Sequence, residues 1–190
     1  MIRSFGRRGI SKAQRFVFDH LVKERKSPCF ELYSSQVQLI TNPTDYYLAL
    51  HKLAGDAERR ICMSSLYLGT GNLEKYLVEK LSKCTQQNPD IRLTMLLDFM
   101  RGTRLSKNGE SSLTMLKPLR QASFKKKVRV GFFHMPDTGL MKGRFSESPL
   151  REIFGVHHIK AHVFDDNVLI TGANLSEDYF TDRQDRCMVI

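Results

Sequence analysis

From residue 37 onward, short apolar runs alternate along the chain with longer stretches that are apolar on one face only. The runs are rich in Val, Ile, Leu and Phe, which is typical of buried strands. The predicted strands comprise residues 37–40, 60–68, 91–97 and 127–133. Between them, apolar residues recur at helical spacing, which predicts amphipathic helices. The sequence therefore predicts strands and helices in alternation.

The signals for helix ends support this division of the chain. Thr44 is a predicted N-cap of the first helix, and Asn72 is a predicted N-cap of the second. Asn88-Pro89-Asp90 ends the second helix, and a further helix is expected at about 113–120. Such alternation indicates an α/β sandwich with a mostly parallel sheet flanked by helices. Ligands of such sheets tend to lie beyond the carboxyl ends of the strands.

The stretch from His158 to Asn174 reads HIKAHVFDDNVLITGAN and predicts two short strands joined by a turn at Asp165. His158 and Lys160 are two residues apart, so their side chains project from the same face of a strand. The imidazole, the ammonium and the carboxamide of Asn174 are therefore expected to converge at one end of the hairpin. Together they suit a phosphodiester, since they offer a nucleophile or proton carrier, a positive charge and a neutral donor.

Composition narrows the choice of partner. The 190 residues are enough for one domain with one good core. A formal net charge of +10 favours an anionic partner, whether nucleic acid, phospholipid headgroups or a phosphorylated small molecule. The four cysteines form no CxxC pair, which argues against a zinc site or a disulfide framework. No apolar run approaches the ~20 residues of a spanning helix, so any membrane contact should be peripheral.

The N-terminal segment differs from the rest of the chain. Residues 1–18 contain five basic residues and no acidic one, with aromatic and aliphatic residues interspersed. This composition fits a mitochondrial transit peptide, and an ordinary basic tail is the alternative. We expect residues 1–30 to be such a peptide or a disordered N-terminus, and residues 36–190 to form the folded domain.

The spacing from His158 through Lys160 and Asp165 to Gly172-x-Asn174 resembles the HKD motif of the phospholipase D superfamily. Further blocks are similar to the mitochondrial phosphatidylglycerophosphate synthases of eukaryotes, a family within it. These blocks are SLYLGTGNLE at 65–74, LDFMRGTR at 97–104, GANLS at 172–176 and YFTDRQDR at 179–186. The resemblance covers about Val37 to Ile190. It implies a phospholipase D-like α/β/α sandwich, which is one half of the usual two-lobed enzyme.

The resemblance also implies an activity. Such enzymes transfer the phosphatidyl group of CDP-diacylglycerol to sn-glycerol 3-phosphate, releasing CMP, in the cardiolipin pathway. The reaction passes through a phosphohistidine and needs no metal or other cofactor. The expected location is the mitochondrial inner membrane, with peripheral contact to anionic lipid and no nucleic-acid partner.

Site residues follow from the same resemblance. It implies catalytic roles for His158, Lys160 and Asp165, although whether His158 is the nucleophile or the general acid stays open. The resemblance assigns substrate phosphate to Asn174 and makes Asp185 the candidate for orienting the partner histidine. Arg101 and Arg104, which with Lys107 follow a predicted strand end, are expected to hold an anionic headgroup or the glycerol phosphate. Three alternatives stay open: Asp165 as a hairpin anchor, Asp185 in a salt bridge with Arg183 or Arg186, and the two arginines as a solvated basic loop.

One departure bears directly on activity. No second His-x-Lys-x4-Asp occurs in the 190 residues, whereas the synthases carry two in a longer chain. The chain is therefore expected to be a fragment or shortened isoform, to pair with a second copy, or to be inactive alone. The alternative functions are a homodimeric phosphodiesterase or nuclease, and a non-catalytic half that binds anionic lipid or a partner chain.

Overall fold

The computed structural model describes residues 11–24, 28, 30–121, 127–134 and 155–190. The chain divides into two compact units, Met1–Ser35 and Gln36–Ile190. In the first unit, α1 (Lys12–Asp19) is followed by a π-helical turn at His20–Glu24 and a 3-10 turn at Ser34–Gln36. Ser11 and Gln14 form a capping box that fixes the start of α1. Within the described residues, no helix is long and apolar enough to cross a membrane.

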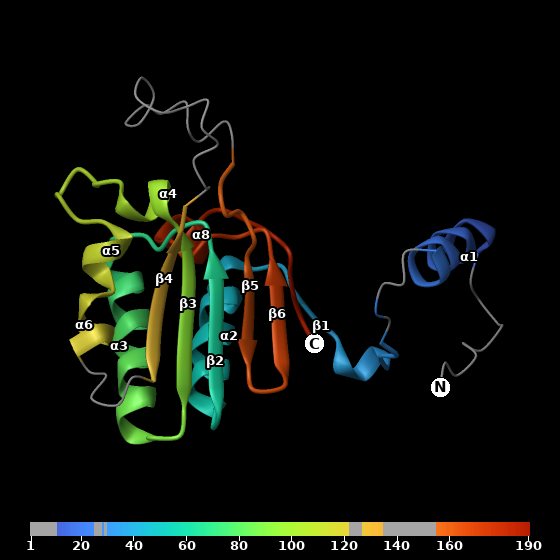
Figure 1. The fold of residues 1–190 in the computed structure, drawn as a ribbon, viewed down its shortest axis with the longest axis horizontal. Helices are drawn as coiled ribbons and strands as arrows, with labels where there is room; N and C mark the ends of the chain where they lie inside the picture. The colour runs from blue at the N-terminus through green and yellow to red at the C-terminus, as the bar shows by residue number, and fades with distance from the viewer. Residues whose placement is uncertain (1–10, 25–27, 29, 122–126, 135–154) are drawn as a thin grey trace. The chain divides into compact units, whose positions relative to one another are not determined.

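The second unit is built on a seven-stranded sheet with the order β1-β7-β6-β5-β2-β3-β4 (Figure 1). Its strands are β1 (Gln38–Ile40), β2 (Arg60–Ser65), β3 (Arg92–Asp98), β4 (Val128–Phe133), β5 (Ala161–Phe164), β6 (Asn167–Thr171) and β7 (Cys187–Val189). Its helices are α2 (Pro43–Asp56), α3 (Asn72–Gln87), α4 (Phe99–Thr103), α5 (Ser112–Met115), α6 (Lys117–Gln121) and α8 (Glu177–Thr181). The α/β class is confirmed.

The sheet is mixed, whereas the alternation of elements predicts a mostly parallel one. Strands β2, β3 and β4 pair in parallel, and all the other neighbours pair antiparallel. The reason lies in the connections. A two-residue turn joins β5 to β6, and so short a link permits only antiparallel pairing. Helix α3 connects β2 to β3, and α4, α5 and α6 lie between β3 and β4, so both crossovers are long enough for parallel neighbours.

Alternate strand residues make the core. In β2 and β3, Ile61, Met63, Leu93, Met95 and Leu97 are buried, while their neighbours in sequence are mostly exposed or half-buried. The apolar faces of α2 and α3 supply Leu50, Ala54, Leu77, Val78 and Leu81 to the same cluster. Burial thus alternates with a period of two along both strands, because successive side chains of a strand point to opposite faces of the sheet.

The directions of the strands bring several chain segments together at one end of the sheet, the end where β2 and β3 terminate. The parallel strands β2 and β3 end there, and β6, which is antiparallel to β5, ends there too. Strand β5 runs the opposite way and therefore begins at this edge (Figure 1). The residues immediately before β5 and those after β6 are thus neighbours.

Three local predictions were wrong. Asn42, not Thr44, is the N-cap of α2, because Pro43 fits the first helical position and the Asn42 side chain accepts from the N–H of Thr44. Gly71, not Asn72, caps α3. The expected helix at 113–120 is divided into α5 and α6. Pro118 has no N–H to continue the first helix.

Candidate active site

The side chains of His158 and Lys160 meet at the edge of the sheet where β5 begins. The Lys160 Nζ lies 3.0 Å from each ring nitrogen of His158 and donates to the His158 carbonyl oxygen at 3.1 Å. Lys160 is only 5% exposed, whereas His158 is exposed to solvent. The ammonium is therefore held beneath an open imidazole, an arrangement that can present both groups to one phosphoryl group.

Asp185 supplies the negative charge beside this pair. Burial lowers the pKa of Lys160, and the Asp185 carboxylate partly offsets that shift. The carboxylate lies against Gly172, where an added Cβ would come within 2.6 Å of Oδ2. A larger residue at position 172 would therefore displace the Asp185 carboxylate. Among the described residues the salt-bridge alternative is not observed, since Arg183 lies over the Tyr179 ring and Arg186 donates through its backbone N–H.

Asn174 follows β6 and reaches the same edge. Its neighbour Leu175 bridges to Leu68, and the Gly69 N–H donates to the Leu175 carbonyl at 2.8 Å. On the other side, the Thr171 N–H donates to the Lys160 carbonyl at 3.2 Å. Asn174 is buried, and its Oδ1 has no hydrogen-bond partner within the part of the chain that is described. The segments that carry Lys160 and Asn174 are thus hydrogen-bonded to each other through Thr171.

Asp98 and Ser64 hold the segment that precedes β5 and contains His158. The sequence predicted no role for either residue. The Asp98 carboxylate accepts from the His157 N–H and from the Arg101 N–H, each at 2.9 Å. Ser64 donates to the carbonyl of Ile159 at 3.1 Å and lies 2.6 Å from the His157 ring. Asp98 is buried at the carboxyl end of β3. Its position at the end of a predicted strand is the feature of the sequence that could have indicated its importance.

His157 and His162 are neighbours of the site. Burial lowers the pKa of His157, opposed by the Asp98 carboxylate and reinforced by the Lys160 ammonium. His162 is fully buried on β5, and burial lowers its pKa to about 3. Both of its ring nitrogens lack a partner among the described residues. His162 is therefore neutral and belongs to the core.

The structure separates Asp165 from the catalytic pair. Asp165 lies in the β5–β6 turn at the opposite end of β5, about 16 Å from Lys160 at the rise of an extended strand. Its carboxylate accepts from the backbone N–H groups of Glu58, Arg59 and Arg60 at 2.7–2.9 Å. Burial raises its pKa, but these hydrogen bonds outweigh that effect and lower it overall. The catalytic assignment of Asp165 is thus corrected to the anchoring alternative.

Arg101 and Arg104 line a small pocket of about 190 Å³. Its other lining residues are Tyr67, Leu68, Gly69, Thr70, Leu105, Ser106, Ser111 and Ser112. The two arginines therefore face a defined hollow between the segments that follow β2 and β3. This placement is compatible with the predicted role in holding substrate phosphate.

Glu74 is a second buried acid near this edge that sequence reasoning left without a role. Its Oε1 accepts from the Glu177 N–H at 2.7 Å, which ties the first turn of α3 to the first turn of α8. Burial raises its pKa, against the effect of backbone hydrogen bonds. An added Cβ on Gly69 would clash with the same carboxylate, so this turn requires glycine.

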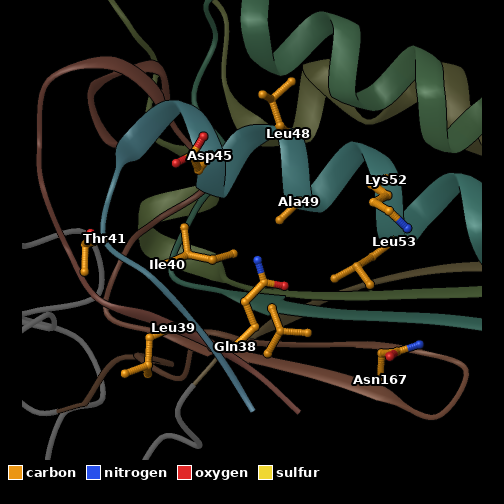
Figure 2. Close-up of a pocket in the computed structure, with 11 residues that line it drawn as sticks. Gln38, Leu39, Ile40, Thr41, Asp45, Leu48, Ala49, Lys52, Leu53 and Asn167 are labelled. Atoms are coloured by element: carbon orange, nitrogen blue, oxygen red, sulfur yellow. The ribbon is translucent and has the colours of Figure 1, made fainter. Parts of the chain in front are cut away.

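A larger hollow of about 490 Å³ lies between β1 and α2 (Figure 2). Its lining includes the apolar side chains of Leu39, Leu48 and Leu53 and the charged residues Asp45 and Lys52. It contains none of the site residues predicted from the sequence.

Two solved structures share the fold. The phosphatidylserine synthase of Haemophilus influenzae superposes with a TM-score of 0.69 at 23% identity, over 84% of this chain and 34% of that chain. Nuc from Salmonella typhimurium, described as a phospholipase D family member, gives a TM-score of 0.56 at 15% identity, over 81% of each chain. The protein therefore has the phospholipase D fold. No family model matches the chain.

Comparison with known sequences narrows the resemblance to one kind of enzyme. The mitochondrial CDP-diacylglycerol–glycerol-3-phosphate 3-phosphatidyltransferase of Gallus gallus is 45% identical over 170 residues, covering 86% of this chain and 30% of that protein. The human counterpart is 40% identical over 166 residues, with 84% and 29% coverage. A probable member from Dictyostelium discoideum is 38% identical, with 87% and 28% coverage. The chain is a homologue of these phosphatidyltransferases, and it spans less than a third of their length.

Proposed function

We propose that this chain supplies half of the active site of a phosphatidyltransferase. The reaction would transfer the phosphatidyl group of CDP-diacylglycerol to sn-glycerol 3-phosphate and release CMP, which makes phosphatidylglycerophosphate. The observation that carries the proposal is the contact of the Lys160 ammonium with the His158 ring, in a chain homologous to enzymes named for this reaction. No cofactor takes part.

The proposed mechanism uses two imidazoles, one of them from His158. One imidazole nitrogen attacks the phosphatidyl phosphorus, and the P–O bond to CMP breaks while the other imidazole gives its proton to the departing oxygen. The acceptor hydroxyl then attacks phosphorus, its proton returns to the second imidazole, and the P–N bond breaks. Lys160 and Asn174 hold the nonbridging oxygens, where charge gathers in each transition state.

The second imidazole comes from outside this motif. It belongs either to a second HKD half of the same enzyme or to a second copy of this chain. Asp185 would orient that partner histidine, and its position beside Lys160 supports this role. Arg101 and Arg104 would hold substrate phosphate, because both face the small pocket beside the site.

The proposed location is peripheral, on the mitochondrial inner membrane. The relatives from chicken and human are named as mitochondrial proteins. Residues 1–30 would be the transit peptide, and residues 36–190 the phospholipase D-like domain. The net charge of +10 suits anionic lipid. We propose no nucleic-acid partner.

A homodimeric phosphodiesterase is the second candidate. The observation that favours it is the match in fold to Nuc, which covers 81% of each chain. It would share the His158 and Lys160 chemistry with water as the acceptor. A third outcome, an inactive shortened isoform, predicts binding of anionic lipid without turnover.

The test is CMP release from CDP-diacylglycerol with and without sn-glycerol 3-phosphate. A phosphatidyltransferase releases CMP in step with phosphatidylglycerophosphate, and His158→Ala abolishes both. The matched control is His134→Ala, which changes an exposed histidine at the end of β4. Hydrolysis of a simple phosphodiester without use of the acceptor would favour the second candidate. Retained transfer in His158→Ala would reject the site.

A further inference from the structure

The pocket that contains Arg101 and Arg104 has the size and charge of a site for a small anion. Its volume of about 190 Å³ is below the ~300 Å³ at which sites for drug-sized ligands begin, so a nucleotide or a diacylglycerol does not fit inside it. Two guanidinium groups line it, and none of its ten lining residues is acidic. Arginine is the residue type best suited to phosphate, because its donors match two oxygens at once.

Hydroxyl groups complete the lining. Thr70, Ser106 and Ser111 each bring a side chain that is able to donate to an oxyanion. The wall beside them is fixed, since Ser112 Oγ accepts from the Leu68 N–H at 3.0 Å and donates to the Leu68 carbonyl at 2.6 Å. The pocket is therefore preorganised on one side, which reduces the entropy lost on binding.

Both ends of the pocket connect directly to the catalytic segments. Asp98 accepts from the Arg101 N–H with one oxygen and from the His157 N–H with the other. On the opposite wall, Gly69 donates to the carbonyl of Leu175, the residue after Asn174. The walls of the pocket are therefore hydrogen-bonded to the residue before His158 and to the residue after Asn174.

The two substrates of the proposed reaction differ in their phosphates. Each phosphate of CDP-diacylglycerol is doubly esterified and carries one negative charge. The acceptor carries a phosphomonoester, which has about 1.5–2 negative charges at neutral pH. A compact pocket with two guanidinium groups therefore matches the acceptor better than the donor.

We propose that this pocket binds the phosphomonoester of the acceptor, sn-glycerol 3-phosphate, and so points its free hydroxyl at the phosphorylated imidazole. This inference rests on the proposed function, and it assigns Arg101 and Arg104 to the acceptor rather than to the donor. The phosphomonoester keeps all its bonds during the reaction. Its role is to hold the acceptor in place and to exclude alcohols without a phosphate.

The experiment measures two properties of the natural protein that contains this chain, in the wild type, Arg104→Ala and Lys107→Ala. The first is calorimetric binding of sn-glycerol 3-phosphate, with glycerol as the ligand control. The second is exchange of labelled CMP into CDP-diacylglycerol, which needs the imidazoles but no acceptor. Lys107 is the matched control, because it is an exposed cation three residues from Arg104 and outside the pocket lining.

We expect Arg104→Ala to weaken binding of sn-glycerol 3-phosphate about 10–100-fold, the range for a charged hydrogen bond, which is a larger change than any in its CMP exchange. The Lys107→Ala variant should stay at wild-type level in both measurements. Binding that is unchanged in Arg104→Ala, or absent from the wild type, would overturn the pocket assignment. Loss of exchange in Arg104→Ala would also overturn it, by moving the pocket to the donor. If exchange is absent from the wild type while binding still depends on Arg104, the proposed function fails and the pocket assignment stands.

Discussion

The carboxylate of Asp98 accepts a hydrogen bond from the backbone N–H of His157 at 2.9 Å. His157 is the residue immediately before His158, and the other Asp98 oxygen holds the first turn of α4. One buried side chain at the end of β3 therefore fixes both the segment that leads to His158 and the segment that carries Arg101.

Asp98→Ala should lower the free energy of unfolding by about 2–4 kcal/mol, because it leaves two backbone N–H groups without their acceptor. Asp98→Asn should cost less, since one carbonyl oxygen remains. Urea denaturation measures both. The control is Asp90→Ala, which removes an exposed carboxylate 3.7 Å from Lys127 and should cost under about 0.5 kcal/mol. Equal losses at the two positions would contradict the role of Asp98.

Lys160→Met should separate activity from stability. Methionine keeps much of the buried volume and removes the cost of burying a charge, while Asp185 loses a neighbouring cation, so the protein should stay folded at room temperature. Transfer should fall by about 10²–10³-fold, because the positive charge at the phosphoryl oxygens is lost. The measurements are CMP release and urea denaturation on the same sample. Unfolding of Lys160→Met at room temperature would instead show that the ammonium is structural.

Asp165 should matter for stability only, and in a pH-dependent way. Asp165→Ala leaves three backbone N–H groups unpaired and should cost about 2–4 kcal/mol at neutral pH, while CMP release per folded molecule stays unchanged. The folded pKa of Asp165 is lowered, so its contribution is complete above the unfolded pKa of about 3.9 and disappears as pH falls through the folded value.

Urea denaturation near pH 7 and at about pH 3 tests this prediction, since the stability that a lowered carboxyl pKa supplies declines once the pH falls below the unfolded value. The difference between wild type and Asp165→Ala should shrink at the lower pH. Asp165→Asn should be milder, because asparagine also tolerates the left-handed backbone of this position, at φ 51°. A difference that is constant with pH would contradict the anchoring carboxylate.

Much of the architecture could be predicted from the sequence, and the errors have local causes. The apolar runs at 60–68 and 91–97 mark buried strands correctly, because strands in the interior of a sheet are rich in apolar residues. The antiparallel half of the sheet was underestimated, since pairing direction depends on which strands meet and not on any one strand's pattern. The spacing of His158 and Lys160 also predicted their contact, because alternation along an extended chain is independent of tertiary context.

The supporting residues could not be predicted in the same way. Asp98 and His157 are 59 positions apart, and Glu74 and Glu177 are 103 apart. Such contacts exist only once the strands are ordered in the sheet. Asp165 was misassigned because a sequence motif groups residues by spacing, whereas a strand places its two ends at opposite edges of the sheet.

His162 should make the protein less stable in mild acid. Burial lowers its folded pKa to about 3, so between that value and the unfolded pKa of about 6.5 only the unfolded state takes up the proton. From pH 7 to pH 5 this uptake should lower the free energy of unfolding by about 2 kcal/mol, and His162→Phe should remove that loss. Urea denaturation at both pH values measures it, with His20→Gln as the control. An unchanged pH dependence in His162→Phe would contradict the buried neutral state.

The central claim is that His158 acts at the reacting phosphorus, and trapping the phosphorylated enzyme tests it most directly. CDP-diacylglycerol labelled in its lipid-bound phosphate is mixed with the natural protein that contains this chain, without acceptor, and the protein is quenched with alkali. The wild type should hold an alkali-stable, acid-labile label, and CMP should appear with it. His158→Ala should hold almost none, since it lacks either the nucleophile or the acid that releases CMP. Labelling of His158→Ala at the wild-type rate would contradict the account.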